Sequence, residues 1–235
     1  MTVLVTGAAG AIGAAIVARL LEDGHGVIAH DLRTPAADRA PGSVMPISGD
    51  LADGGGLGAQ LEEVGQELDA IIAAHGVDGS GALCDLDDAF VRRVLRINAA
   101  SVPALLTAVR PHLRRPAVFV VVGSQAGLVG EPNNAAYCAS KFGVHGWALA
   151  ASDEDVAVRV LAPGCTESPL LYDAQARFAA ARGVSVEHFV DERRARIPLR
   201  RFATARQTAA AAVYLAGLDG PRPALLAATG GEVLR

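Results

Sequence analysis

Tyr137 and Lys141 lie four residues apart in the stretch AAYCASKFG, residues 135–143. Lys141 is the only lysine among the 21 lysine and arginine residues, so a general preference for arginine does not explain it. On a helix, residues at this spacing share one face. An ammonium beside a phenol favours the phenolate and lowers the phenol's pKa, which makes the tyrosine a candidate acid/base. The pair therefore predicts proton transfer at a hydroxyl, as in the oxidation of a secondary alcohol.

Ser124 ends a strongly apolar run 13 residues before Tyr137, and we expect it to hydrogen-bond the substrate oxygen. A lysine suits a site with two ribose hydroxyls because its compact ammonium donates in several directions, whereas arginine presents a wide planar fork. The competing interpretation is an exposed lysine on a helix surface. That interpretation is disfavoured because arginine fills such positions elsewhere in the chain.

The stretch TGAAGAIG, residues 6–13, predicts a nucleotide-binding turn between a strand and a helix. Gly7 permits a sharp turn, Gly13 permits close packing, and the helix N-terminus favours a pyrophosphate. The next strand ends in Asp31, 18 residues after Gly13. Its carboxylate accepts from ribose hydroxyls and repels a 2′-phosphate, which favours NAD over NADP, although Arg33 argues for NADP. The alternative is a tight turn without a ligand.

Composition narrows the class of protein. A net charge of −4 disfavours general nucleic-acid binding. The N-terminus shows no signal-peptide pattern, and no apolar run approaches membrane-spanning length, so we expect a cytoplasmic protein that does not enter membranes. The three cysteines are isolated and suggest free thiols, with no metal site.

Short apolar runs alternate with helical patterns along the chain. This order predicts an α/β fold: a Rossmann-like, doubly wound parallel sheet with helices on both faces, in three layers. We expect one nucleotide-binding domain over residues 1–235, with a helical flap at about 166–196 that has no place in the sheet. The expected strands are 2–7, 26–31, 44–50 (weakened by Pro46), 68–76, 117–124 and 156–164, and the expected helices are 11–24, 86–113 and 135–152.

These motifs, in this order, resemble those of the short-chain dehydrogenase/reductase family along nearly the whole chain. TGAAGAIG resembles the TGxxxGxG turn, with Ala11 at the middle glycine, and YCASK resembles YxxxK. The APGCTESPL segment at 162–170 is similar to the family's PG segment beside the nicotinamide. Asp50 occupies the place of an adenine-contacting aspartate.

The resemblance implies an NAD(P)-dependent alcohol dehydrogenase or ketoreductase that forms a homodimer or homotetramer and acts on a small molecule. It implies the catalytic residues Asn98, Ser124, Tyr137 and Lys141. It implies cofactor contacts from Gly7, Ala9, Ala11, Ile12, Gly13, Asp31, Leu32, Asp50, Leu51, Ala74, Gly76, Tyr137, Lys141, Pro163, Gly164 and Thr166. It implies substrate contacts from Ser124, Gln125, Asn134, Tyr137 and Leu170.

Several alternatives stay open. Asn98 is either part of a proton relay or only a helix-kink residue. His75 replaces a family alanine, in Ala73-Ala74-His75-Gly76 where relatives have Asn-Asn-Ala-Gly, and a packed or hydrogen-bonded role is preferred to a catalytic one. An arginine run over 193–201 either clamps a carboxylate or phosphate or, as preferred, forms a solvated helix surface or salt bridges between subunits.

Three functional hypotheses follow. An NAD-dependent dehydrogenase of secondary alcohols is preferred. An NADPH-dependent ketoreductase of the 3-oxoacyl type is disfavoured by Asp31. A nucleotide-sensing or scaffold protein without turnover is disfavoured by the intact Ser-Tyr-Lys set.

Overall fold

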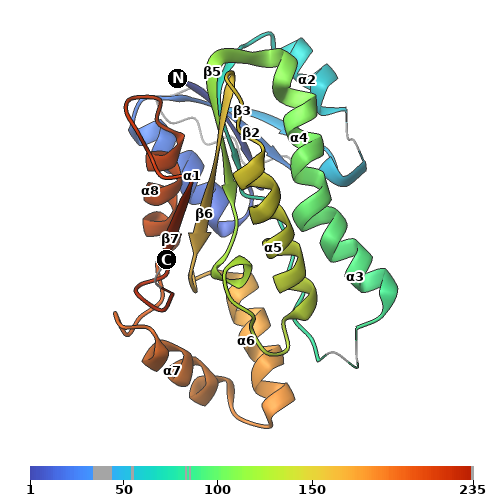
Figure 1. Cartoon of the computed structure of the whole chain (residues 1–235), viewed down its shortest axis with the longest axis vertical. Helices are drawn as coiled ribbons and strands as arrows, with labels where there is room; N and C mark the ends of the chain where they lie inside the picture. The colour runs from blue at the N-terminus through green and yellow to red at the C-terminus, as the bar shows by residue number, and fades with distance from the viewer. Residues whose placement is uncertain (34–43, 54–55, 83, 85, 234–235) are drawn as a thin grey trace.

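Seven parallel strands form one sheet at the centre of the folded molecule (Figure 1). The computed structural model describes residues 1–33, 44–53, 56–82, 84 and 86–233. The sheet order is β3-β2-β1-β4-β5-β6-β7. β2 and β3 are added on one side of β1 and the later strands on the other side, which confirms the doubly wound fold. The strands are β1 (Thr2–Thr6), β2 (Gly26–Asp31), β3 (Val44–Ser48), β4 (Leu68–Ala73), β5 (Leu113–Val122), β6 (Val156–Pro163) and β7 (Leu225–Ala228).

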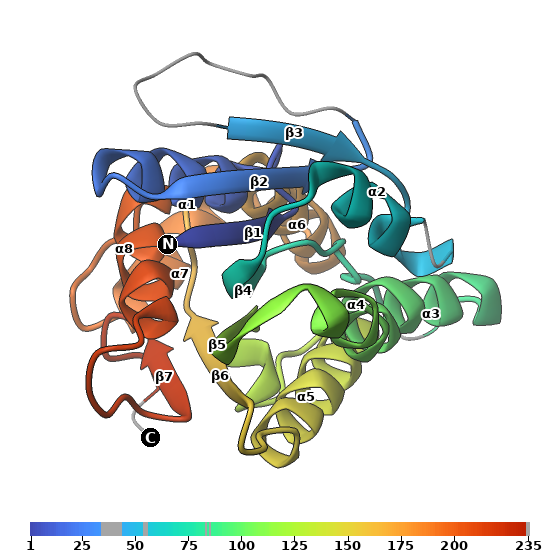
Figure 2. The same cartoon turned by 90° about the horizontal axis from the view of Figure 1, so that it is seen from above.

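Helices cover both faces of the sheet (Figure 2). On one face α1 (Ala11–Glu22) packs against α8 (Ala205–Ala216). The other face carries α2 (Leu57–Val64), α4 (Ser101–Val109) and α5 (Ala135–Ala150). Two apolar clusters fill the spaces between the layers, and both include residues of β4 and β5, whose alternate side chains point to opposite faces. The continuous apolar pattern of these strands is explained by burial on both sides.

The helix expected over 86–113 is interrupted. It consists of α3 (Asp88–Leu95), a π-helical turn η3 (Arg96–Ala100), α4 and a short 3₁₀ turn η4 (Arg110–His112). Asp87 caps α3 by accepting from the Phe90 N–H at 2.7 Å. The π-turn places Asn98 inside the protein, where its side chain is buried.

The ends of the sheet differ most from the sequence-based expectation. β3 is an edge strand, which is where a strand tolerates Pro46. The strand β7 and the helix α2 were not predicted. β7 has only four residues, and α2 begins and ends at the glycines Gly56 and Gly65, both with positive φ.

The expected flap consists of two helices outside the sheet, α6 (Pro169–Arg182) and α7 (Val186–Arg196), beyond the C-terminal ends of the strands (Figure 1). Ser168 and Ser185 cap them through side-chain bonds to the backbone N–H groups of Leu171 and His188. Val190, Ile197 and Phe202 form a small core beneath α7. No helix in the described part of the chain has the length and apolar character needed to cross a membrane.

Candidate active site

The glycine turn has the geometry of an anion-binding loop. Gly7 has a φ of +69°, and a Cβ there would lie 2.7 Å from the backbone of His75. A Cβ at Gly13 would lie 2.0 Å from the Gly7 carbonyl oxygen, so both glycines are required by close backbone approach. Gly10 precedes α1 without a side-chain cap, which leaves backbone N–H groups of the first turn free for a ligand.

A cavity of about 580 Å³ opens beside this turn. It lies at the ends of β1, β2 and β4, where the strand order reverses. Its walls include eight of the residues that the sequence assigned to the cofactor: Gly7, Ala9, Asp31, Leu32, Asp50, Leu51, Ala74 and Gly76. Gly10 and Arg33, which the sequence did not assign to cofactor contacts, line it too.

The carboxylate of Asp31 ties the turn to β2. One oxygen accepts from the Ala9 N–H at 3.0 Å, and the other accepts from the Leu32 N–H at 2.7 Å. Each oxygen retains a lone pair, so Asp31 can still accept from a ribose hydroxyl. Arg33 lies in the same cavity wall without an ion pair to Asp31 among the described residues.

Tyr137 and Lys141 share the inner face of α5, as the sequence predicted. Lys141 is 5% exposed, and its Nζ lies 5.5 Å from the centre of the Tyr137 ring. The ammonium donates to the Val122 carbonyl oxygen at 3.2 Å. Burial lowers the pKa of Lys141 to about 8, so most of it is charged at neutral pH.

The expected lowering of the Tyr137 pKa does not occur in the protein alone. Burial of the phenol raises its pKa well above the ordinary value, a hydrogen bond with Ser124 acts against this shift, and the negative charges of Glu131 and Asp78 add to it. The expectation relied on the ammonium of Lys141 together with a positively charged nicotinamide ring, whereas desolvation is the largest cause of the shift in the protein alone. Tyr137 is therefore a protonated acid when only protein groups surround it.

Ser124 lies two residues beyond the end of β5 rather than in the strand. It begins the 3₁₀ turn η5 (Gln125–Gly127), and its Oγ accepts from the Ala126 N–H at 3.1 Å. The Ser124 N–H in turn donates to Nε2 of His145 at 3.3 Å. These bonds fix the serine from both its side chain and its backbone.

His145, one turn after Lys141, is a buried support for this serine that the sequence reasoning missed. The ring fits between two glycines, because a Cβ at Gly123 would lie 1.9 Å from its Nε2 and one at Gly127 would lie 2.6 Å from its Cε1. Burial and the nearby charge of Lys141 lower the pKa of His145 to about 4. The imidazole is therefore neutral near pH 7, as an acceptor of the Ser124 N–H must be.

We expect His145→Leu to lower both the melting temperature and kcat. The variant leaves the buried Ser124 N–H without an acceptor, at a cost of about 1–3 kcal/mol, and the displaced serine should lower kcat by about tenfold or more. Thermal unfolding and steady-state kinetics measure these effects. His145→Gln, which restores an acceptor, should recover part of both losses; wild-type values for the leucine variant would contradict the assignment.

Asn98 and His75 join the elements behind the site. Asn98 accepts from the Val77 N–H at 2.8 Å and donates to the Val77 carbonyl oxygen at 2.9 Å, which secures the segment after β4. His75 accepts from Thr6 at 2.7 Å and donates to Ser101 at 2.8 Å, because the Ser101 hydroxyl itself donates to the Ile97 carbonyl. His75 is thus the hydrogen-bonded residue that was preferred, and burial lowers its pKa to about 4.

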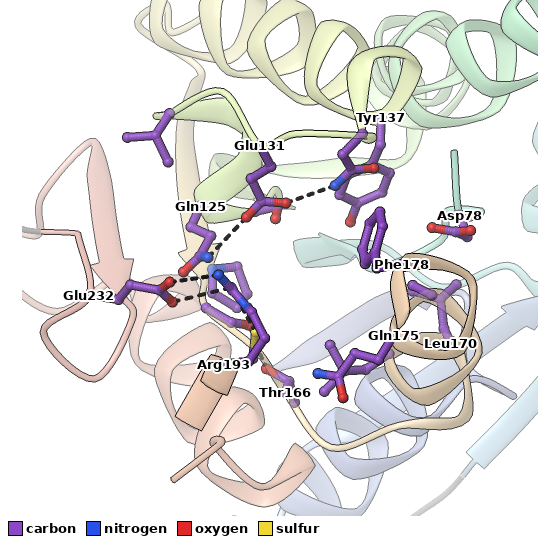
Figure 3. A pocket seen from close by; sticks show the side chains of 18 of the residues that line it. Asp78, Gln125, Glu131, Tyr137, Thr166, Leu170, Gln175, Phe178, Arg193 and Glu232 are labelled. Carbon is purple, nitrogen blue, oxygen red and sulfur yellow. Dashed lines mark hydrogen bonds and ion pairs between the residues drawn. The ribbon is translucent and has the colours of Figure 1, made fainter. Parts of the chain in front are cut away.

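A second cavity, of about 690 Å³, lies between η5, α5 and the flap (Figure 3). The phenol of Tyr137 faces it, with Glu131 and Gln125 on one side and Phe178 of α6 on the other. All five residues that the sequence assigned to the substrate line this cavity: Ser124, Gln125, Asn134, Tyr137 and Leu170. Besides Tyr137, four residues assigned to the cofactor line it as well: Ile12, Pro163, Gly164 and Thr166.

Four assigned residues lie outside the cavity walls. In the described part of the chain, neither wall includes Ala11, Gly13, Asn98 or Lys141. Thr166 directs its hydroxyl to Thr208 at 2.9 Å and to the Gly164 carbonyl at 3.3 Å, so this group is engaged within the protein. Ser168, two residues on, also lines the cavity and was not assigned.

Some arginines of the 193–201 run form contacts within the protein, and Arg193 and Arg196 line the larger cavity. Arg193 pairs with Glu232 at 3.0 Å and is only 17% exposed along its side chain, so it forms a neutral part of the wall. Arg194 pairs with Asp191 at 3.6 Å. Arg201 donates to Gln207 at 2.9 Å. These contacts lie within one chain, so Arg194 and Arg201 fit the expected helix surface, whereas Arg193 is largely buried and the expected salt bridges between subunits stay a prediction.

A family model described as short chain dehydrogenase matches residues 1–177. The chain belongs to the short-chain dehydrogenase family. Such a match accounts for the glycine turn, the Tyr137–Lys141 pair and the serine before them, all of which lie within the matched residues. Relatives of the chain differ in the reactions that their names state.

The chain is 28% identical to the 3-oxoacyl-(acyl-carrier-protein) reductase FabG of Thermotoga maritima, over 91% of this chain and 89% of that protein. It is 29% identical to the cis-4-hydroxycyclohexanecarboxylate dehydrogenase of Sinomonas cyclohexanicum, over 91% and 88%. A crystal structure of a variant actinorhodin polyketide ketoreductase with NADPH is 25% identical, with a TM-score of 0.89 over 98% of this chain and 96% of that chain. The chain is therefore an oxidoreductase of this family with ketoreductase-type and dehydrogenase-type relatives.

Proposed function

We propose that this short-chain dehydrogenase interconverts a secondary alcohol and a ketone with NAD, and that Tyr137 is the acid/base. The observation that carries the proposal is that Tyr137 and Ser124 share the wall of the 690 Å³ cavity, with the Nζ of Lys141 5.5 Å from the centre of the Tyr137 ring. When bound, the nicotinamide accepts or supplies the hydride. The smaller cavity, beside the glycine turn, would take the adenosine half of a dinucleotide, and the larger one its nicotinamide and the substrate.

Each residue has a distinct proposed task. Ser124 donates to the substrate oxygen and holds it beside the phenol. Tyr137 takes the hydroxyl proton during oxidation and returns it during reduction. Lys141 donates to ribose hydroxyls and stabilises the phenolate that forms, since a charge that is fixed in a buried site acts strongly there. Asn98 holds the segment after β4 in place and is proposed to serve a proton relay.

The cofactor is proposed to be held by the residues of the smaller cavity and by the segment after β6. Gly7 and Gly13 fit this role because a side chain at either would collide with backbone. Asp50 and Leu51 would face the adenine, and Asp31 its ribose. Pro163 and Gly164 would flank the nicotinamide.

An NADPH-dependent ketoreductase is the second candidate. The observation in its favour is Arg33, which lies in the wall of the smaller cavity and could bind a 2′-phosphate. The relatives named as ketoreductases, one of them with NADPH, support it. Asp31, close to the same position, would repel that phosphate.

We expect NADH to stabilise the chain against thermal unfolding more than NADPH does at the same concentration. A ligand at about 100 times its Kd adds about 2.7 kcal/mol to the free energy of unfolding. Asp31→Ala should reduce the preference by at least about tenfold, or about 1.4 kcal/mol, whereas Arg33→Gln should leave NADH binding unchanged. A larger shift with NADPH for the wild-type chain would favour the ketoreductase.

The remaining proposals concern organisation. We infer a single nucleotide-binding domain with α6 and α7 as its substrate flap, a homodimer or homotetramer, and a cytoplasmic location. Support for association comes from Phe142 and Leu149 on α5, which are 46% and 53% exposed. A sedimentation measurement at several concentrations tests the assembly.

A further inference from the structure

The wall of the larger cavity next to Tyr137 carries an unpaired carboxylate. Glu131 follows η5 by a few residues and lines the cavity. Its two oxygens accept from two side-chain amides, Gln125 Nε2 at 3.0 Å and Asn134 Nδ2 at 2.7 Å (Figure 3). No ion pair joins it to a cation among the described residues, although Arg193 lies on the same wall. A carboxylate accepts about four hydrogen bonds, so each oxygen keeps a free lone pair.

The side-chain amides of Gln125 and Asn134 make hydrogen bonds through their nitrogens but not through their oxygens. Gln125 is 4% exposed and Asn134 is 5% exposed, and the carbonyl oxygens of both side chains are buried without a partner. Their orientation is fixed, because each amide nitrogen must face the carboxylate. Both oxygens are closed off from solvent, so the two amides act by holding Glu131, whose carboxylate is the acceptor that lines the cavity.

Asn134 also gives up a structural role. It is the N-cap residue of α5, a position where asparagine ordinarily bonds the free N–H groups of the first turn. Here its side chain makes no capping bond and turns to Glu131 instead. Asn134 therefore holds the Glu131 carboxylate at the cavity in place of a capping bond that would stabilise α5.

The other walls of the cavity include apolar side chains and an ion pair within the protein. Val129, Leu171, Phe178 and Phe189 provide an apolar surface. The charges of Arg193 and Glu232 cancel in their ion pair. The cavity therefore has an apolar part, a neutral polar part and a cluster of acceptors beside the proposed acid/base.

From this geometry we infer that Glu131, held by Gln125 and Asn134, selects a substrate that carries a hydrogen-bond donor, a hydroxyl or an ammonium, close to the carbon that is oxidised or reduced. This inference rests on the proposed function and adds the substrate class to it. A carboxylate or phosphate at that position would meet the charge of Glu131 and is disfavoured. A simple hydrocarbon alcohol leaves the Glu131 carboxylate without a donor.

The test compares four alcohols with one carbon skeleton: cyclohexanol, 1,2-cyclohexanediol, 2-aminocyclohexanol and 2-hydroxycyclohexanecarboxylate, each as both cis and trans forms where they exist. We measure kcat/KM for NAD reduction with the wild-type chain and with Glu131→Gln and Glu131→Leu. Glu154→Gln, an exposed carboxylate on the loop between α5 and β6, is the matched control. Thermal stabilisation by NADH checks that each variant is folded.

The diol or the amino alcohol should exceed cyclohexanol by about tenfold or more in the wild-type chain, and Glu131→Leu should remove that advantage while changing cyclohexanol by less than about threefold. If the amino alcohol leads and Glu131→Gln already removes its advantage, the donor recognised is an ammonium. If the diol leads and the glutamine variant retains part of its advantage, the donor is a hydroxyl.

Two results would overturn the inference alone: cyclohexanol or the carboxylate as the best substrate, or an equal effect of the Glu131 variants on all four alcohols. A wild-type chain that binds NADH but oxidises none of the four contradicts the proposed function as well. The failure of the donor inference is thereby distinguished from the failure of the reaction.

Discussion

Tyr137→Phe is expected to abolish alcohol oxidation while leaving the fold and nucleotide binding in place. The substitution removes only the phenolic oxygen, so the ring still packs in its buried position on α5. Loss of a positioned acid/base lowers kcat by about 10²–10⁴-fold. The measurement is kcat with the best alcohol from the panel, together with the thermal shift on NADH addition.

Tyr172→Phe is the matched control, since Tyr172 is 41% exposed on α6 and loses the same atom. This variant should keep kcat within about twofold of the wild-type value, well inside the range of a lost catalytic group. Turnover that survives in the Tyr137 variant would mean that another group transfers the proton.

Lys141→Arg is the second substitution with a large expected effect. The guanidinium keeps a positive charge, but it needs more room than the buried ammonium, which lies close to the Val122 carbonyl and to Gly76. We expect kcat to fall by about 10²-fold or more, as for the loss of a preorganised charge at a reacting oxygen. Weaker binding of NADH, measured by thermal shift, should accompany it.

Arg92→Lys, the reciprocal change on an exposed residue of α3, controls for the exchange of the two cations. It should alter neither activity nor stability measurably, because exposed ion pairs contribute little. Lys141→Met separates charge from size by keeping an unbranched chain without a cation. If the arginine variant binds NADH and turns over like the wild-type chain, the special role of lysine is wrong.

The pH dependence should not arise from the buried histidines. Burial lowers the pKa values of His75 and His145 to about 4, so both stay neutral above about pH 5. Lys141 has a pKa lowered to about 8, and its charge is lost as the pH rises through that value. An activity loss on the alkaline side is therefore expected to reflect Lys141 and the nucleotide it holds.

Much of the fold was predictable because the strands are buried on both faces and the turns carry glycines. β1, β2, β4 and the turn at Gly7 and Gly13 follow directly from these patterns. β7 was not predictable, since four residues without alternation carry no periodic signal. The π-turn at Asn98 was also hidden, because one extra residue in a helix leaves the apolar pattern almost unchanged.

The site divides in a similar way. Tyr137 and Lys141 were predictable because a fixed spacing on one helix places them together. The direction of the Tyr137 pKa was not, since it depends on burial by segments distant in sequence. His145 and Glu131 gave no signal in the sequence alone, because their roles depend on Gly123, on Asn134 and on a cavity that only the fold creates.

The most direct test of the account is to follow a label from the carbinol carbon of a secondary alcohol. We would incubate the wild-type chain with NAD and the deuterated form of the best alcohol in the panel, and analyse the reduced cofactor by mass spectrometry. The account predicts NADH that carries one deuterium per ketone formed, with none from Tyr137→Phe. Ketone formation without deuterium in NADH, or NADH binding with no transfer from any alcohol, would contradict it.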